Sequence, residues 1–211
     1  MQFVIVPFKN FLEAKSRMRK TVSYDTTIKI VKIMLEHVLS EIKNSKKSDK
    51  NFIVTKDKEA VKLAEKFGFD VLLEEKQSGE SSSVDWASKK LYEMGASSVL
   101  RLPADLPLIE SRDVDEIFER SNETNSSILV PSRSGLGTNA FLRSPPEIVP
   151  SFFGSNSMEK HIAAFEEKGA DYSVVKNENI GFDVDSGEDL KELGLLAKRS
   201  LAVTSILNLI N

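Results

Sequence analysis

The chain has 211 residues, of which 40% are hydrophobic and 29% are charged, and its formal net charge at pH 7 is −3. This balance is typical of a soluble globular protein, and the length suits one α/β domain over residues 1–211. No apolar run reaches the roughly 20 residues of a membrane-spanning helix, and the apolar start is too short for a secretory signal. The absence of cysteine excludes disulfides, thiolate metal sites and cysteine nucleophiles, so we expect a cytoplasmic protein.

Charge is unevenly distributed along the chain. Residues 1–50 hold 11 Lys and Arg against 5 Asp and Glu, and the remainder holds 18 against 27. A basic segment can indicate a nucleic-acid or membrane surface, but this one lacks interleaved aromatic residues, and much of it lies on a predicted helix. We therefore expect no nucleic-acid or membrane partner and predict a small, highly phosphorylated ligand.

Short β-branched runs alternate with amphipathic helical patterns. This order predicts an α/β three-layer sandwich with a mostly parallel central sheet, and ligands bound beyond the carboxyl ends of the strands. Ser23 is expected to cap the first helix, and Gly68 and Gly95 are expected to close the next two in left-handed conformations. The expected strands are 3–6, 52–55, 71–73, 99–102, 128–130, 139–142 and 172–175, and the later helices are 57–67, 83–94, 158–168 and 190–210.

Three cations follow the first predicted strand. Lys9, Lys15 and Arg17 lie in the loop before the first helix, at the edge of the sheet where a ligand is expected. An arginine binds two phosphate oxygens at once and a lysine supplies a point charge, so this loop suits a triphosphate. It carries neither a P-loop nor a dinucleotide fingerprint, and a solvated basic loop is the alternative.

A single carboxylate stands at the exit of the fourth predicted strand. Asp105 lies between Pro103 and Pro107, which stiffen the turn. The expected cap of the helix that follows is Ser111, which leaves Asp105 without a capping role. Asp105 is therefore predicted to be a metal ligand.

Two more carboxylates, Asp183 and Asp185, alternate along an expected extended segment and so share one face. Magnesium prefers oxygen ligands and bridges substrate phosphates, so two or three carboxylates and a triphosphate form a sensible magnesium site. The alternative is structural. Ser186 and Asp189 resemble a capping box for the last helix, and Asp185 would then favour the positive end of that helix.

Two further segments suit a second, acidic substrate. Residues 134–139 form a glycine-rich turn, whose amide groups and Thr138 hydroxyl can hold an anion. Residues 153–157 precede a helix whose N-terminus offers free N–H groups and a positive dipole end. The alternative for this second segment is that Ser155 and Asn156 are ordinary helix caps.

Five motifs follow one another along the chain: PFK at 7–9 with KSR at 15–17, PADLP at 103–107, GTNA at 137–140, FGSNS at 153–157 and DVDS at 183–186. In order and spacing they resemble the 2-phospho-L-lactate guanylyltransferase family. The resemblance covers the chain from about Phe3 to Leu193. Each motif is modest alone, and the five together are specific.

The resemblance implies a Rossmann-like fold of the nucleotide-diphospho-sugar transferase (GT-A) type. It implies transfer of GMP from GTP to 2-phospho-L-lactate or phosphoenolpyruvate in coenzyme F(420) biosynthesis, with Mg²⁺, or alternatively Mn²⁺, as cofactor. We also expect a homodimer, and the apolar tail at 201–210 either covers the sheet or meets another subunit. By this similarity the metal ligands are Asp105, Asp183 and Asp185, the acid-binding residues are Thr138, Asn139, Gly154 and Ser157, and Lys9, Lys15 and Arg17 face the triphosphate.

The same resemblance sets the expected mechanism. Asp105 and the three cations of the first loop are the expected catalytic residues, and no general base is needed because the attacking phosphate is already anionic. Catalysis then depends on positioning and on charge neutralisation. His161 lies on the same helical face as Ser157, and we expect this lone histidine to be structural rather than a catalytic base.

One segment departs from the family pattern. Such enzymes usually carry a Leu-Asn pair at the start of the third helix, near the nucleobase, and this chain reads GESSSV at 79–84. A serine hydroxyl differs from the fixed donor and acceptor pair of an amide, so we expect changed guanine contacts, with Ser82 facing the nucleotide. The alternatives are another sugar-phosphate nucleotidyltransferase or a glycosyltransferase of the same fold, and an inactive nucleotide-binding module.

Overall fold

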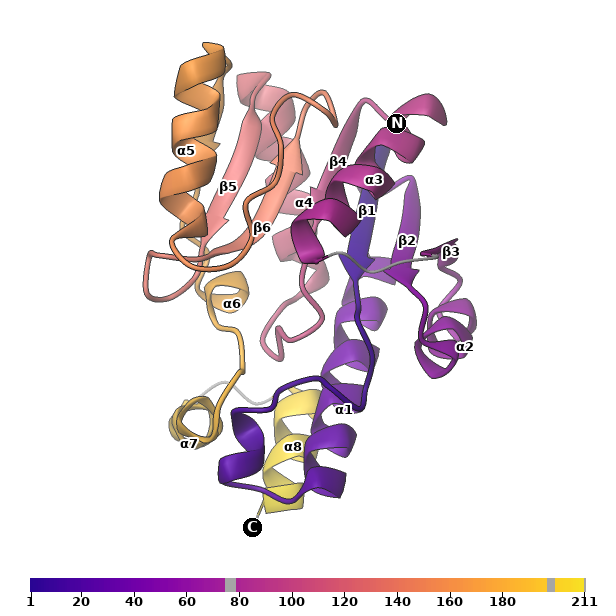
Figure 1. The fold of residues 1–211 in the computed structure, drawn as a ribbon, viewed down its shortest axis with the longest axis vertical. Coiled ribbons are helices and arrows are strands. Elements are labelled where there is room, and N and C mark those ends of the chain that lie inside the picture. The colour runs from indigo at the N-terminus through magenta and orange to yellow at the C-terminus, as the bar shows by residue number, and fades with distance from the viewer. Residues whose placement is uncertain (75–78, 197–199, 211) are drawn as a thin grey trace.

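The computed structural model describes residues 1–74, 79–196 and 200–210. A seven-stranded sheet with the strand order β3-β2-β1-β4-β6-β5-β7 lies at its centre (Figure 1). β1 and β4 are neighbours in the middle of the sheet, so the loops that leave them meet at its carboxyl edge. The strands are β1 Gln2–Pro7, β2 Lys50–Thr55, β3 Asp70–Leu73, β4 Ser98–Arg101, β5 Ser127–Pro131, β6 Thr138–Arg143 and β7 Tyr172–Val174.

The sheet is mostly parallel, as predicted. The pairs β1–β2, β2–β3, β1–β4 and β5–β7 are parallel, whereas β6 runs antiparallel to both β4 and β5. Arg101, the last residue of β4, pairs with Phe141 in β6. Because β6 runs the other way, its first residues, Thr138 and Asn139, lie just beyond the end of β4, at the edge where a ligand is expected.

Most helix boundaries follow the local signals in the sequence. Ser23 caps α1, because its Oγ accepts a hydrogen bond from the backbone N–H of Thr26 at 3.1 Å. Gly68 and Gly95 follow α2 and α3 with φ of 80° and 91°, the left-handed conformations predicted for them. The helices are α1 Tyr24–Lys43, α2 Lys58–Lys66, α3 Glu80–Glu93, α4 Ser111–Thr124, α5 Ser157–Lys168, α6 Glu178–Gly181, α7 Gly187–Leu195 and α8 Leu201–Ile210, with a short 3-10 helix, η1, at Met18–Lys20.

The cap predicted for α4 is wrong by one residue. Glu110, not Ser111, occupies the N-cap position. The Glu110 carboxylate accepts from the backbone N–H of Asp113, and the Asp113 carboxylate accepts from the backbone N–H of Glu110 at 2.8 Å. This reciprocal pair satisfies the first turn of the helix, and Ser111 begins the helix itself.

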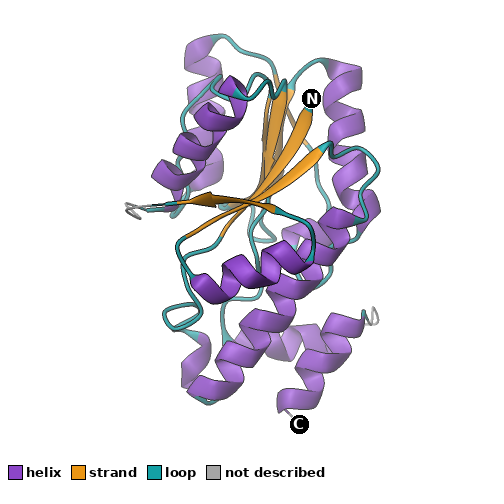
Figure 2. Ribbon diagram, turned by 90° about the vertical axis from the view of Figure 1, so that its right-hand side faces the viewer, coloured by secondary structure: helices purple, strands orange, loops and turns teal. Residues whose placement is uncertain are grey.

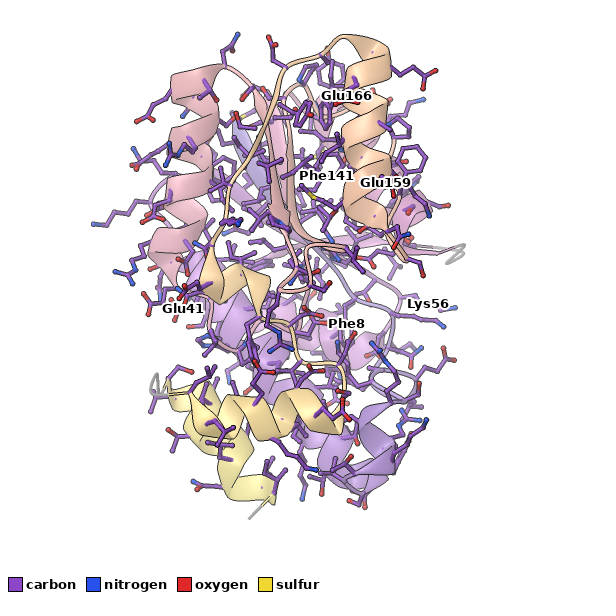
Figure 3. The ribbon with its side chains drawn as sticks, turned by 90° about the vertical axis from the view of Figure 1, so that its left-hand side faces the viewer. Phe8, Glu41, Lys56, Phe141, Glu159 and Glu166 are labelled. Carbon is purple, nitrogen blue, oxygen red and sulfur yellow. The ribbon has the colours of Figure 1, made fainter. Side chains whose placement is uncertain are left out.

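Helices pack on both faces of the sheet (Figure 2). In β1, Phe3 and Val4 are both fully buried on opposite faces, Val4 in the cluster that includes α1 and α4, and Phe3 in the cluster that includes α3. Phe141 of β6 packs against α5, whose Glu159 and Glu166 are exposed (Figure 3). Burial of each such side chain contributes about 1.5–3 kcal/mol to the stability of the fold. The helices on both faces therefore stabilise the sheet whose edge carries the candidate site.

The tail predicted as one helix over 190–210 forms two helices, α7 and α8, and residues 197–199 lie outside the described residues. Val203 and Ile206 of α8 are buried in the cluster that includes α1. Figure 1 shows α8 beside α1, away from the strands. The apolar tail therefore packs against α1 rather than over the sheet. Across the described residues, no helix combines the length and apolar character that a membrane span requires.

Gly187, the first residue of α7, lies so close to Thr21 that an added Cβ would overlap the threonine side chain. We expect Gly187→Ala to reduce the free energy of unfolding by about 1–3 kcal/mol, because the chain near Thr21 must shift. Gly194 in the same helix is the matched control. A Cβ there would lie 3.6 Å from its nearest neighbour, so Gly194→Ala should be neutral or slightly stabilising. Urea unfolding of the two variants and the wild type measures these free energies. Equal stability of Gly187→Ala and Gly194→Ala would contradict the close contact at Gly187.

Candidate active site

Two cavities adjoin at the carboxyl edge of the sheet. The first, of about 540 Å³, extends from the loop after β1 to the start of α3. The second, of about 890 Å³, extends from the same loop to β6 and the start of α5. Groups bound in the two cavities can meet along the residues that line both. These residues, here called the junction, are Lys15, Arg17, Glu80, Arg101, Pro103, Asp105 and Asp185.

Three carboxylates predicted to be metal ligands come together beside Lys15. Asp105, Asp183 and Asp185 each offer an oxygen, and these oxygens lie within 4.8 Å of one another. The segment around Val184 is irregular rather than a strand. Val184 is nevertheless fully buried, and its N–H donates to the Asp105 carbonyl at 3.1 Å. This bond fastens the two segments and turns the flanking aspartates toward the cavities.

Two of the three predicted cations lie at this acidic cluster. Lys15 Nζ contacts the carboxylates of both Asp105 and Asp185, and Arg17 Nη2 contacts Asp185 at 2.5 Å. Burial alone would lower the pKa of Lys15, but the two carboxylates outweigh it and raise the pKa above its usual range. Lys15 also has a left-handed backbone with φ of 55°. That conformation costs about 1–2 kcal/mol, which its ion pairs offset.

The third predicted cation, Lys9, lies apart from the cluster. It lines the first cavity, and its Nζ pairs with Glu13 at 2.5 Å on the exposed surface. Exposed pairs of this kind are worth about 0–1 kcal/mol, so Lys9 can exchange Glu13 for a bound phosphate at small energetic cost.

The two neighbouring aspartates are held in different electrostatic states. Burial raises the pKa of Asp183, and the Asp105 carboxylate raises it further. Burial also acts to raise the pKa of Asp185, but Lys15 and Arg17 lower it below its usual range. Asn139 donates to Asp183 Oδ1 at 3.0 Å and to the Ile180 carbonyl at 2.8 Å, so this buried amide orients the Asp183 carboxylate. The predicted contact of Asn139 with the acid substrate stays a prediction.

The acidic cluster fits a divalent cation. Asp105 Oδ1 is buried and has no hydrogen-bond partner among the described residues. A buried carboxylate oxygen without a partner carries a desolvation cost that a bound cation would remove. Carboxylate oxygens are the ligands that magnesium prefers, and three of them on two fastened segments leave coordination positions for phosphate oxygens.

A buried polar network forms one wall of the second cavity. Thr138 Oγ1 lies 3.0 Å from His161 Nδ1 and accepts from Ser157 Oγ at 3.2 Å. The Phe152 backbone N–H donates to His161 Nε2 at 2.8 Å, so Nε2 is an acceptor. A neutral His161 therefore carries its hydrogen on Nδ1 and donates it to Thr138. Sequence patterns placed His161 beside Ser157 but could not show that it links β6 to the loop before α5.

That loop also positions Gly154. Gly154 has φ of 120°, a conformation that L side chains rarely adopt, and it lines the second cavity. Asn156 is the N-cap of α5, but its side chain makes no capping hydrogen bond, and Ser157 is the first helical residue. The alternative that these residues are helix caps is therefore confirmed for the position of Asn156 and wrong for Ser155, which precedes the cap. The start of α5 faces the cavity without a capping side chain, which suits an anion.

The serine-rich start of α3 is divided between the cavity and the scaffold. Ser83 lines the first cavity and donates to the Gly79 carbonyl at 3.0 Å. Ser81 Oγ accepts from the Phe153 backbone N–H at 2.8 Å, which ties α3 to the loop before α5. Ser82 is exposed and is not among the described residues that line either cavity. Its predicted contact with the nucleotide stays a prediction.

Two residues of the junction were not singled out from the sequence. Arg101 ends β4 and is only 6% exposed, and the Glu80 carboxylate is its ion-pair partner. A charged residue in an otherwise apolar strand is a usable signal, because arginine is rarely buried without a partner.

The fold is that of nucleotide-diphospho-sugar transferases. A protein of Desulfovibrio desulfuricans G20 described as such a transferase has a TM-score of 0.79 at 13% identity, and the match covers 99% of this chain and 96% of that one. For 4-diphosphocytidyl-2C-methyl-D-erythritol synthase the TM-score is 0.64 at 15% identity, and the match covers 93% and 99%. At these identities the likeness establishes the fold alone.

The sequence establishes the family. Residues 2–203 match the family described as "Guanylyl transferase CofC like", and the chain belongs to this family of nucleotidyltransferases. A phosphoenolpyruvate guanylyltransferase of Rubrobacter xylanophilus is 31% identical over 191 residues, which cover 90% of this chain and 92% of that protein. A 2-phospho-L-lactate guanylyltransferase of Methanobrevibacter smithii is 28% identical over 192 residues, which cover 90% and 82%. The resemblance inferred from the five motifs is confirmed.

His161 gives the protein an acid-sensitive stability. Burial, reinforced by Arg101 and Arg143, lowers the pKa of His161 from 6.5 to about 3. Below pH 6.5 the unfolded chain binds a proton that the folded chain does not bind. The stability present above pH 6.5 is therefore lost as the pH falls toward 3, by up to about 1.4 kcal/mol per pH unit.

We expect His161→Asn to be less stable than the wild type at pH 7, with a difference that shrinks by about 2 kcal/mol between pH 6.5 and pH 5. Urea unfolding of both proteins across this pH range measures the difference in their free energies of unfolding. Titrating groups that the two proteins share cancel in this difference. A difference that does not change with pH would show that the pKa of His161 is the same in the folded and unfolded chains, which contradicts the prediction.

Proposed function

We propose that this protein transfers a GMP unit from GTP to a small phosphorylated carboxylic acid and releases pyrophosphate. The observation that carries the proposal is the position of the acidic cluster, Asp105, Asp183 and Asp185, beside Lys15 and Arg17 where two cavities meet. The names of the relatives supply the acid, which is phosphoenolpyruvate for one and 2-phospho-L-lactate for another. The product is lactyl-2-diphospho-guanosine or its enolpyruvyl analogue, in coenzyme F(420) biosynthesis.

The two cavities suit two substrates. The first cavity takes GTP, with the triphosphate at the loop after β1 and the nucleoside toward the start of α3. The second takes the acid against β6 and the uncapped start of α5. Thr138, Gly154 and Ser157 are the residues that we place on the acid, and Lys9, Lys15 and Arg17 those that we place on the triphosphate. The junction then contains both reacting phosphates.

The reaction is an in-line displacement at phosphorus. An oxygen of the acid's phosphate attacks the α-phosphorus of GTP, the bond from that phosphorus to the oxygen bridging to the β-phosphate breaks, and pyrophosphate leaves with the electron pair. The acid is then joined to GMP through a diphosphate. The attacking oxygen is already anionic, so no proton has to be removed. The neutral His161 fits this scheme, because it is in place as a structural donor rather than as a base.

Charge neutralisation is the main demand of this chemistry, since a triphosphate and a phosphorylated acid both carry several negative charges. Asp105, Asp183 and Asp185 would hold Mg²⁺, with Mn²⁺ as the alternative, and a bound divalent cation would supply electrostatic stabilisation of the phosphate oxygens. Lys15 and Arg17 orient phosphate oxygens and stabilise developing charge on the leaving group. Cytoplasmic location and a homodimer remain expectations alongside this scheme.

Pyrophosphate release with Mg²⁺ tests the proposal. We expect turnover with GTP and with phosphoenolpyruvate or 2-phospho-L-lactate, and much slower turnover when ATP, CTP or UTP replaces GTP or when 3-phosphoglycerate replaces the acid. A glycosyltransferase would release no pyrophosphate. Binding of GTP without any turnover across this grid would instead indicate an inactive nucleotide-binding module.

Asp105→Asn tests the acidic cluster. We expect turnover to fall at least about 100-fold, because the substitution removes a charge on which both metal binding and the Lys15 position depend. Asp115→Asn is the matched control, since Asp115 accepts hydrogen bonds from the turn at Ser45 and Lys46 and is not among the described residues that line either cavity. Initial rates over a range of Mg²⁺ concentrations provide the measurement, and near wild-type turnover of Asp105→Asn would exclude the metal assignment.

A further inference from the structure

The junction contains a third cation, Arg101, which the scheme above does not use. Its side chain is 7% exposed, lies at the end of β4 and lines both cavities. The other two junction cations, Lys15 and Arg17, contact the acidic cluster. Arg101 instead contacts Glu80, the Phe153 ring and two carbonyls of β6, so the acidic cluster does not engage its charge.

The guanidinium of Arg101 is held rigidly on the side of the second cavity. Its Nη1 donates to the carbonyls of Thr138 at 3.3 Å and Asn139 at 3.1 Å. Its central carbon lies 4.2 Å from the centroid of the Phe153 ring, next to Gly154. These contacts fix the plane of the guanidinium against the wall on which we place the acid. A donor fixed in advance loses little side-chain entropy when it binds a ligand.

The hydrogen-bonding capacity of Arg101 is not fully used. Its Nε is buried without an acceptor among the described residues, and its Nη2 contacts one oxygen of Glu80. Nε and Nη2 together form the fork that binds two oxygens of a carboxylate or phosphate. The Glu80 side chain is 42% exposed and lies in the first turn of α3, so it is the solvent-accessible member of the pair.

We propose that Arg101 binds the phosphate of the acid substrate, and that the Glu80 carboxylate holds the guanidinium until this phosphate replaces it. The inference rests on the proposed guanylyl transfer for the identity of the substrate. In this scheme GTP occupies the first cavity and the acid occupies the second. The phosphate of the acid therefore has to reach the junction in order to attack the α-phosphorus of GTP. Arg101 lines both cavities and is fixed to β6, so it is placed for the phosphate rather than for the nucleobase.

This proposal distinguishes the two members of the ion pair. Arg101→Met removes a ligand of the phosphate, whereas Glu80→Gln removes a charge that competes with the phosphate and preserves the size of the side chain. If the pair were only structural, both substitutions would act in the same direction. We expect opposite effects on the KM for the acid.

Arg143→Met is the matched control. Arg143 is another buried arginine on the same face of the sheet, paired with Asp85 at 2.7 Å and lying 5.3 Å from the centroid of the Phe141 ring. It is not among the described residues that line either cavity. Loss of Arg143 should therefore reduce stability without changing the KM of either substrate.

Steady-state pyrophosphate release, with each substrate varied in turn, measures these effects. We expect Arg101→Met to raise the KM for the acid about 10- to 100-fold and to leave the KM for GTP within about twofold. Glu80→Gln should lower the KM for the acid, because the competing carboxylate charge is gone. If Arg101→Met does not fold, Arg101→Lys keeps the charge but loses the fork, and it should still raise the KM for the acid. An unchanged KM for the acid, or a rise confined to GTP, overturns the proposal.

Calorimetric titration with phosphoenolpyruvate and Mg²⁺ in the absence of GTP separates this inference from the proposed function. If the wild type releases no pyrophosphate but binds phosphoenolpyruvate, and Arg101→Met binds it at least about tenfold more weakly, the proposed reaction fails and the phosphate site stands. Equal binding by the wild type and by Arg101→Met, or no binding by the wild type, overturns the phosphate site.

Discussion

Three carboxylates with oxygens within 4.8 Å of one another repel each other, and the carboxyl edge of the sheet depends on the positive charge that offsets this repulsion. Lys15 supplies it by contacting Asp105 and Asp185, which lie 80 residues apart in the sequence. The order of the strands makes this contact possible, because β1 and β4 are neighbours and deliver Lys15 and Asp105 to the same edge. The same ion pairs of Lys15 with Asp105 and Asp185 thus hold the loops of this edge together and bring the charged groups of the candidate site into place.

The sheet was largely predictable because its strands are short apolar runs bounded by polar turns, and helix signals such as Ser23, Gly68 and Gly95 act within a few residues of their effect. The pairing of β6 was not predictable from periodicity. An antiparallel strand inserted between β4 and β5 has the same local pattern as a parallel one, and its direction is fixed by contacts remote in the sequence. Yet that reversal is what brings Thr138 to the cavity.

The candidate site was predictable where local chemistry is unusual, as for Asp105 between two prolines and for the alternating Asp183 and Asp185. The hydrogen-bond network inside the wall was not. His161 links Thr138 to the Phe152 backbone, and neither partner lies at a spacing that a helical pattern reveals. Lys15 was expected to face a triphosphate. Its direct contacts with two aspartates depend on the order of the strands in the sheet, which the sequence pattern does not specify.

Buried arginines are weak evidence for function by themselves, and the two on this face of the sheet show what separates a scaffold residue from a binding residue. Arg143 donates to Asp85, Ser88 and the Val149 carbonyl, and its partners hold α3 and the loop before α5 together. The Nε of Arg101 has no acceptor in the part of the chain that the structure describes, and its ion-pair partner Glu80 is half-exposed beside a cavity.

The charge of both arginines reaches His161 and, together with burial, keeps the imidazole neutral. The wall therefore carries its positive charge on arginine guanidinium groups rather than on the imidazole, and His161 serves there as a neutral hydrogen-bond donor.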